Sequence, residues 1–218
     1  MKQIQYAFFL VLAANGLFFI NGLTAKAHAE EVAGYVQDLY HGWEEIRYKT
    51  PTNEQEKGYQ ELKVKADKTV EEHPEDASAW IWRGIIASTY AGAKGGLSAL
   101  SLVKEAKASL EQAISIDPNA FGGAAYTSLG ALYYQVPGWP LSFGDDDKAA
   151  ELLLKGLNMN PAGIDANFFY GDYLAEQGQF DKARQYLNRA LEADPRPTRP
   201  VADAGRREEI YAVLKRMN

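Results

Sequence analysis

Cysteine is absent from this 218-residue chain, and histidine occurs only three times. Without cysteine the chain forms no disulfide, offers no thiolate nucleophile or cysteine-ligated metal site, and has no residue to carry a lipoprotein anchor. Only His41 and His73 lie after residue 29, and they show no metal-ligand spacing. The sequence therefore predicts no metal and no cofactor, and it leaves packing as the source of stability.

Long apolar runs are missing except near the N-terminus. Lys2 is followed by a mostly apolar stretch from Tyr6 to Leu23, and residues 27–29 are Ala-His-Ala. This is the three-part pattern of a secretory signal peptide that is cleaved after residue 29. The alternative is an uncleaved membrane anchor, but two Asn and two Gly interrupt the stretch. We expect export to the periplasm, removal of residues 1–29 and no stable membrane insertion afterwards.

Basic residues are few relative to acids. Residues 1–29 hold two lysines and no acid, so the rest of the chain has 21 basic and 29 acidic residues and a formal charge of −8. This balance argues against nucleic acid or an anionic membrane surface as the partner. Seven of the nine arginines lie between residues 183 and 218, and we interpret this cluster as a solvated face.

What the sequence does contain is a repeat. Prolines preceded by His, Asp or Asn recur at positions 74, 118, 161 and 195, with spacings of 44, 43 and 34 residues. A small residue, a leucine and another small residue precede each of the last three prolines by twelve, eight and five positions. This stripe is typical of one face of an α-helix, which the dipeptide ending in proline then stops. The stripe residues are Ala106, Leu110, Ala113, Ala149, Leu153, Gly156, Ala183, Leu187 and Ala190.

A second helix is predicted before each stripe. Its signature is a larger residue four positions before a glycine: Trp80 and Gly84, Tyr126 and Gly130, Asn167 and Gly171. The glycine removes a side chain where the two helices of a pair cross. Each pair therefore forms a helical hairpin.

The last hairpin resembles a known repeat. Gly171, Ala183, Leu187, Ala190 and Pro195 stand at the positions of the tetratricopeptide repeat, whose period is 34 residues. This resemblance implies an all-α, right-handed solenoid of helical hairpins. It also implies a binding protein rather than an enzyme.

The predicted organisation follows from these landmarks. Residues 30–76 form an N-terminal helical region with a degenerate repeat, marked by Leu62, Ala66, Thr69 and Pro74. Three repeats follow within 77–195, at about 77–118, 121–161 and 164–195. Residues 196–218 form a linker and a capping helix, for which apolar residues between positions 205 and 217 are the evidence.

In a solenoid of this kind the first helices of successive hairpins line the concave surface, which usually binds the partner. The residues beside the packing landmarks predict a mostly apolar face with few acids, and this face lacks the Lys and Asn arrangement of a carboxylate clamp. We expect a protein or peptide partner here, unless the chain's own N- or C-terminal helix fills the groove. The predicted binding residues on this face are Ile81, Ile85, Thr127, Tyr134, Phe168 and Asp172.

Residues 137–147 form the least ordinary insertion. Two prolines and two glycines surround Trp139 and Phe143, which we predict to border an apolar recess together with Tyr134. The alternative is that both rings pack onto the neighbouring repeat. This loop is similar to one in the periplasmic T-component proteins of TRAP transporters, a resemblance that implies a small organic ligand or a transporter subunit as partner. Those relatives are often lipoproteins, which this chain is not.

Catalytic and metal motifs are not evident. Residues 145–147 are three successive aspartates, but they lack the spacing and the distal Glu of a calcium loop. They are better explained as helix capping at the start of the following helix. The sequence shows no nucleophile elbow, phosphate loop or paired carboxylates. We therefore predict a non-enzymatic periplasmic adaptor, with a transport accessory as the alternative.

Overall fold

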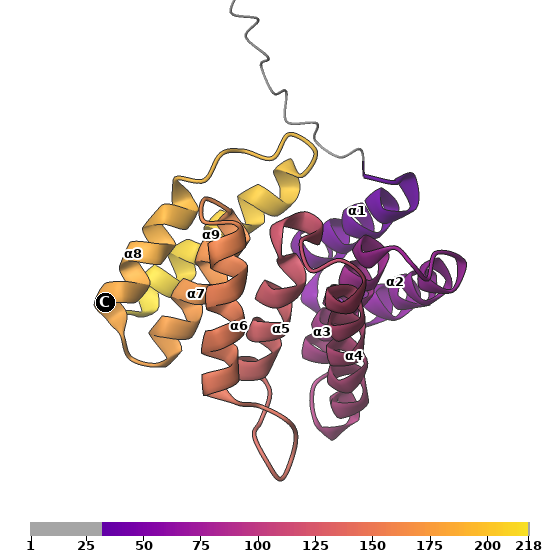
Figure 1. Cartoon of the computed structure of the whole chain (residues 1–218), viewed down its shortest axis with the longest axis horizontal. Helices are drawn as coiled ribbons and strands as arrows, with labels where there is room; N and C mark the ends of the chain where they lie inside the picture. The colour runs from indigo at the N-terminus through magenta and orange to yellow at the C-terminus, as the bar shows by residue number, and fades with distance from the viewer. Residues whose placement is uncertain (1–31, 218) are drawn as a thin grey trace, which may run out of the picture. The chain divides into compact units, whose positions relative to one another are not determined.

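The computed structural model describes residues 32–217, so the predicted signal peptide lies outside the described residues. The described part contains nine α-helices and two short 3₁₀ helices, and it confirms the all-α prediction. Figure 1 follows the helices in chain order from indigo to yellow. The helices are α1 (Gly34–Lys49), α2 (Thr52–Glu72), α3 (Ala77–Lys94), η1 (Leu97–Ala99), α4 (Leu100–Ile116), η2 (Ala120–Gly122), α5 (Ala124–Gln135), α6 (Asp146–Met159), α7 (Ile164–Glu176), α8 (Phe180–Leu191) and α9 (Pro200–Arg216).

Helix ends follow the local chemistry of the chain. The side chain of Asp76 accepts a hydrogen bond from the backbone N of Ser78 at 2.8 Å and caps α3. Asp145 accepts one from the N of Lys148 at 2.9 Å and caps α6, which confirms the capping interpretation of the three aspartates. Each such bond satisfies a backbone donor that has no partner inside the helix.

Each hairpin is held by a leucine of its second helix packed against a glycine of its first. A Cβ at these glycines would come within 2.7–2.9 Å of leucine side-chain atoms, closer than real Cβ contacts. The leucines are at most 5 % exposed. The helices of a pair therefore approach at a distance that only glycine allows. The four glycine–leucine contacts are Gly42 with Leu62, Gly84 with Leu110, Gly130 with Leu153, and Gly171 with Leu187.

The repeat landmarks thus serve the same purpose in all four hairpins, α1–α2 included. The alanines of the predicted stripes are fully buried between neighbouring helices, and their small size lets the helices come together. These alanines are Ala106, Ala113, Ala149, Ala183 and Ala190.

The first helices of the hairpins form a ring of neighbours. Helix α3 contacts both α1 and α5, α7 contacts α5 and α9, and α9 returns to contact α1. The chain's own C-terminal helix therefore forms part of the groove wall. Within residues 32–217, no helix has the length and apolarity to cross a bilayer.

The capping helix begins at Pro200, five residues before the predicted start. Proline suits the first position of a helix because the missing N–H would be unpaired there. Asp203 and Arg206 of its first turns are buried, 5 % and 8 % exposed. The prediction relied on buried positions being apolar. Because these two buried positions carry charged residues, the pattern did not indicate the first turns of the helix.

Candidate functional site

The ring of helices α1, α3, α5, α7 and α9 surrounds a cavity of about 1590 Å³. Small-molecule pockets usually measure about 300–1,000 Å³. The cavity therefore has room for more than a typical small ligand.

Five of the predicted binding residues line this cavity: Ile81, Ile85, Thr127, Phe168 and Asp172. They come from the first helices of three successive hairpins, two from α3, one from α5 and two from α7. The helical period placed these side chains on the inner faces because each stands beside a packing landmark of its own helix.

Tyr134 does not line the cavity. Its hydroxyl donates a hydrogen bond to Oδ2 of Asp172 at 2.8 Å, and its ring meets Tyr173 edge to face. Burial, reinforced by the charge of Asp172, raises the pKa of Tyr134 well above its usual value. Burial also raises the pKa of Asp172. Tyr134 thus borders a separate cleft of about 260 Å³ together with Glu176 and Gln177.

The structure also separates Trp139 from Phe143. Trp139 is 90 % exposed and lines neither the cavity nor the cleft beside Tyr134. Phe143 is half-buried and packs edge to face on Tyr133, with ring centroids 5.3 Å apart. The predicted recess shared by Trp139, Phe143 and Tyr134 is therefore wrong. The alternative of both rings packing onto the neighbouring repeat fails for Trp139, while the ring of Phe143 packs on its own hairpin and its centroid also lies 5.8 Å from Nζ of Lys107 in the preceding repeat.

Pro137 and Leu141 are the residues of this loop that line the cavity, and Leu141 is 58 % exposed. The base of the loop is closed by a hydrogen bond from the N of Gly144 to the carbonyl of Pro137 at 3.0 Å. A side chain at Gly144 would overlap the carbonyl of Val136. Backbone contacts therefore hold the base of the loop, while Trp139 between its two prolines is exposed.

One wall of the cavity is ionic and aromatic. Asp165 accepts hydrogen bonds from Nη1 of Arg196 at 2.7 Å and from Nε of Arg206 at 2.8 Å. The guanidinium of Arg206 also lies 4.4 Å from the ring centroid of Phe168 and 4.7 Å from that of Phe169. A guanidinium so placed gains from both the carboxylate and the ring faces.

The charges on this wall stabilise one another. Burial alone would raise the pKa of Asp165, but the positive charges of Arg206 and Arg196 outweigh burial and hold that pKa below its usual range. Burial would likewise lower the pKa of Arg206, and the charge of Asp165 reverses the effect. All three groups therefore stay ionised near neutral pH.

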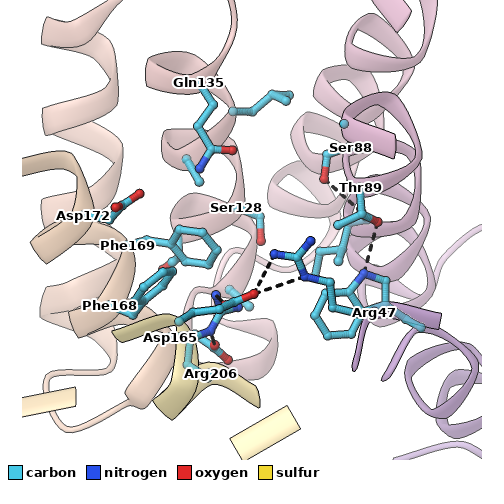
Figure 2. A pocket seen from close by; sticks show the side chains of 18 of the residues that line it. Arg47, Ser88, Thr89, Ser128, Gln135, Asp165, Phe168, Phe169, Asp172 and Arg206 are labelled. Atoms are coloured by element: carbon cyan, nitrogen blue, oxygen red, sulfur yellow. Dashed lines mark hydrogen bonds and ion pairs between the residues drawn. The ribbon is translucent and has the colours of Figure 1, made fainter. Parts of the chain in front are cut away.

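The opposite wall carries hydroxyl groups, and Arg47 of α1 lies beside them (Figure 2). Figure 2 shows Ser88 and Thr89 across the cavity from Phe168 and Phe169, with Ser128 on the helix between them. Thr89 accepts a hydrogen bond from Nε1 of Trp43 at 3.1 Å. The two walls together combine aromatic surface, hydroxyl groups and paired charges.

The sequence analysis missed the arginines. Their clustering after residue 183 was visible, but we interpreted it as a solvated face, whereas Arg196 and Arg206 line the cavity in ion pairs. For Arg206 the available signal was the helical period of α9 continued through its polar positions; Arg196 lies before this helix and had no such signal. Among residues 32–217, no group of three or more His, Asp or Glu side chains is placed to hold a metal ion.

Comparison with known proteins agrees with the repeat pattern. Models of the tetratricopeptide repeat match residues 141–196, which span α6 to α8, and residues 97–120, which span α4. These matches support a tetratricopeptide-repeat family. They give no support to the T-component subgroup suggested by the loop. No curated protein matches the chain.

The solved structures that match the chain include the crystal structure of MamA. It is 17 % identical to this chain, the match covers 73 % of this chain and 86 % of that one, and the TM-score is 0.45. A structure from the functional characterization of Pseudomonas aeruginosa pilF is 16 % identical, with 84 % and 91 % of the two chains covered and a TM-score of 0.35.

Proposed function

We propose that this chain is an exported adaptor that holds a segment of a protein partner in its central cavity. The repeat matches support a protein-binding module. The observation that carries the proposal is the cavity itself, which is lined by the five helices of the ring, the first turns of α2 and the connecting segments.

The cavity volume favours a peptide segment. A helix about 10–12 Å wide that rises 1.5 Å per residue fills roughly 120–170 Å³ per residue. The cavity of about 1590 Å³ then corresponds to about 9–13 residues, or roughly three helical turns. The alternative of a transport accessory would place a small organic ligand in the same cavity, and the surplus volume favours the peptide.

A cavity-filling variant tests this proposal. Ser128 is half-buried and lines the cavity, so Ser128→Trp places a large ring where the partner segment would lie. Val64 is 67 % exposed on α2, and Val64→Trp is the matched control. Peptides selected from a random library on the purified protein provide the probe. We expect Ser128→Trp to weaken their binding at least tenfold, measured by fluorescence anisotropy, with no change for Val64→Trp. Equal binding by both variants would place the peptide site elsewhere.

Export is the second part of the proposal, supported by the N-terminal sequence pattern alone. Intact mass of the protein recovered from a periplasmic extract should correspond to a chain that begins at Glu30. Full-length chain in the membrane fraction would support the anchor instead.

A further inference from the structure

Arg199 occupies an aromatic site on the neighbouring helices. Its guanidinium carbon lies 5.4 Å from the ring centroid of Tyr40 and 4.9 Å from that of Trp82. Its Nε donates a hydrogen bond to Oε1 of Glu44 at 2.7 Å. Two aromatic rings and one carboxylate thus contact the same cation.

The groups around Arg199 are deeply buried. Tyr40 and Trp82 are each 4 % exposed, and Glu44 is 3 % exposed. A buried carboxylate without a cation carries a large desolvation cost, while a desolvated guanidinium is attracted by ring faces. Nε1 of Trp82 is buried without a hydrogen-bond partner, so this ring acts through its face.

We infer that Tyr40, Trp82 and Glu44 form a binding site for a guanidinium cation, and that Arg199 fills this cage from within the same chain. The cage prefers guanidinium to ammonium because a planar, weakly hydrated cation lies against the rings while its Nε reaches the carboxylate. Arg199 is therefore a resident ligand whose place a free guanidinium compound takes when its side chain is removed.

The position of the cage gives it a structural consequence. Tyr40 and Glu44 lie on α1, Trp82 lies on α3, and Arg199 immediately precedes α9. The filled cage therefore joins the first and last helices of the ring around the cavity. We call the contact between α1 and α9, with Arg199 at its start, the seam. Emptying the cage releases α9 from α1 and opens the cavity wall along the seam.

Two other contacts cross the same seam. Nη2 of Arg47 pairs with Oε1 of Glu209 at 2.6 Å, but 43 % of the Arg47 side chain is exposed, which weakens the pair by solvent screening. Gly205 lies so close to Tyr48 that any side chain there would overlap the ring. The cage is thus the buried ionic anchor of the seam, and Arg47 provides a matched control on the same pair of helices.

Chemical rescue tests the assignment without any partner protein. Arg199→Ala empties the cage, and ethylguanidinium at millimolar concentration should bind it and raise the melting temperature by about 2–4 °C. Urea, a neutral isostere, and sodium chloride at equal concentration should not. Arg47→Ala removes the exposed pair and should show no rescue. Glu44→Gln in the Arg199→Ala background should abolish the rescue.

Seam opening is measured separately. Because the chain has no cysteine, spin labels on Asp38→Cys in α1 and Glu208→Cys in α9, both exposed, report the distance between these helices. We expect a longer and broader distance distribution in Arg199→Ala that ethylguanidinium narrows.

Unsaturable rescue, equal rescue by urea, or an unchanged distance in Arg199→Ala would overturn the inference. If Arg199→Ala does not fold, Arg199→Lys is used instead. We expect the distance between the spin labels on α1 and α9 to increase partly in this variant, and ethylguanidinium to shorten it again. A seam that stays closed in this variant would also overturn the inference. Neither the melting temperature nor the spin-label distance depends on peptide binding. A failure of this inference can therefore be distinguished from a failure of the proposed function.

Discussion

The four hairpins and the seam between α1 and α9 are held together by different physical means. Inside each hairpin a buried leucine packs on a glycine, as Leu153 does on Gly130. Across the seam, Glu44 and Arg199 form a buried ion pair within an aromatic site. Apolar packing involves no charged group, whereas an ion pair depends on both charges being present. The hairpins therefore depend on side-chain shape and burial, and the seam depends on a pair of opposite charges.

The largest effect should come from breaking a hairpin. Leu153→Ala removes a side chain that is 1 % exposed, and we expect a loss of about 2–5 kcal/mol in the free energy of unfolding. Its neighbour Leu154 is 40 % exposed, and Leu154→Ala is the matched control, with an expected change below about 0.5 kcal/mol. Urea denaturation of both variants provides the measurement. Equal losses would mean that the glycine–leucine contact is not what holds the pair.

Breaking the seam should cost less. Glu44→Gln keeps the shape but removes the charge that faces Arg199, and we expect a loss of about 1.5–3 kcal/mol. The next residue, Glu45, pairs with Lys49 at the surface and its side chain is 62 % exposed. Glu45→Gln should therefore change the unfolding free energy by less than about 0.5 kcal/mol. A loss from Glu44→Gln as small as the control's would remove the distinction between a buried and an exposed pair.

Acid should weaken the ionic wall while leaving the hairpins alone. The pKa of Asp165 is held below its usual range, so its stabilising contribution is complete above the unfolded pKa of about 4 and is lost as pH falls through the folded pKa. Thermal melts should show the stability gap between the wild type and Asp165→Asn shrinking by about 1 kcal/mol from pH 5 to about pH 2, allowing for partial exposure.

Asp172 supplies the control with opposite sign. Burial raises its pKa, so its contribution is fully present below the unfolded pKa of about 4 and is lost as pH rises through the folded pKa. The wild type should therefore lose stability relative to Asp172→Asn as pH rises from about 4. The same pH trend for both variants would contradict the opposite environments of the two carboxylates.

The difference between the hairpins and the seam also explains which contacts the sequence could predict. The hairpins were predictable because Leu110, Leu187 and the glycines opposite them recur at fixed offsets, and a repeated apolar period is a local signal. The seam was not, because Glu44 and Arg199 are 155 residues apart and each alone resembles an ordinary surface charge. Trp139 misled the loop prediction because an aromatic residue between prolines suggests a buried contact, whereas this residue is 90 % exposed.

Trp139 should show the smallest effect on stability. Its side chain is 90 % exposed on a loop whose base is closed by backbone contacts, so Trp139→Ala should change the melting temperature by less than about 2 °C. Leu141 in the same loop lines the cavity, and a peptide that leaves the cavity past Leu141 would meet the neighbouring indole. We expect Trp139→Ala to weaken binding of the selected peptides by about threefold to tenfold, less than Ser128→Trp does, since exposed aromatics contribute at interfaces once covered. Anisotropy and circular dichroism melts on one preparation separate the two effects. A large drop in melting temperature with binding intact would show that the ring packs back on the repeats and contributes to the fold instead.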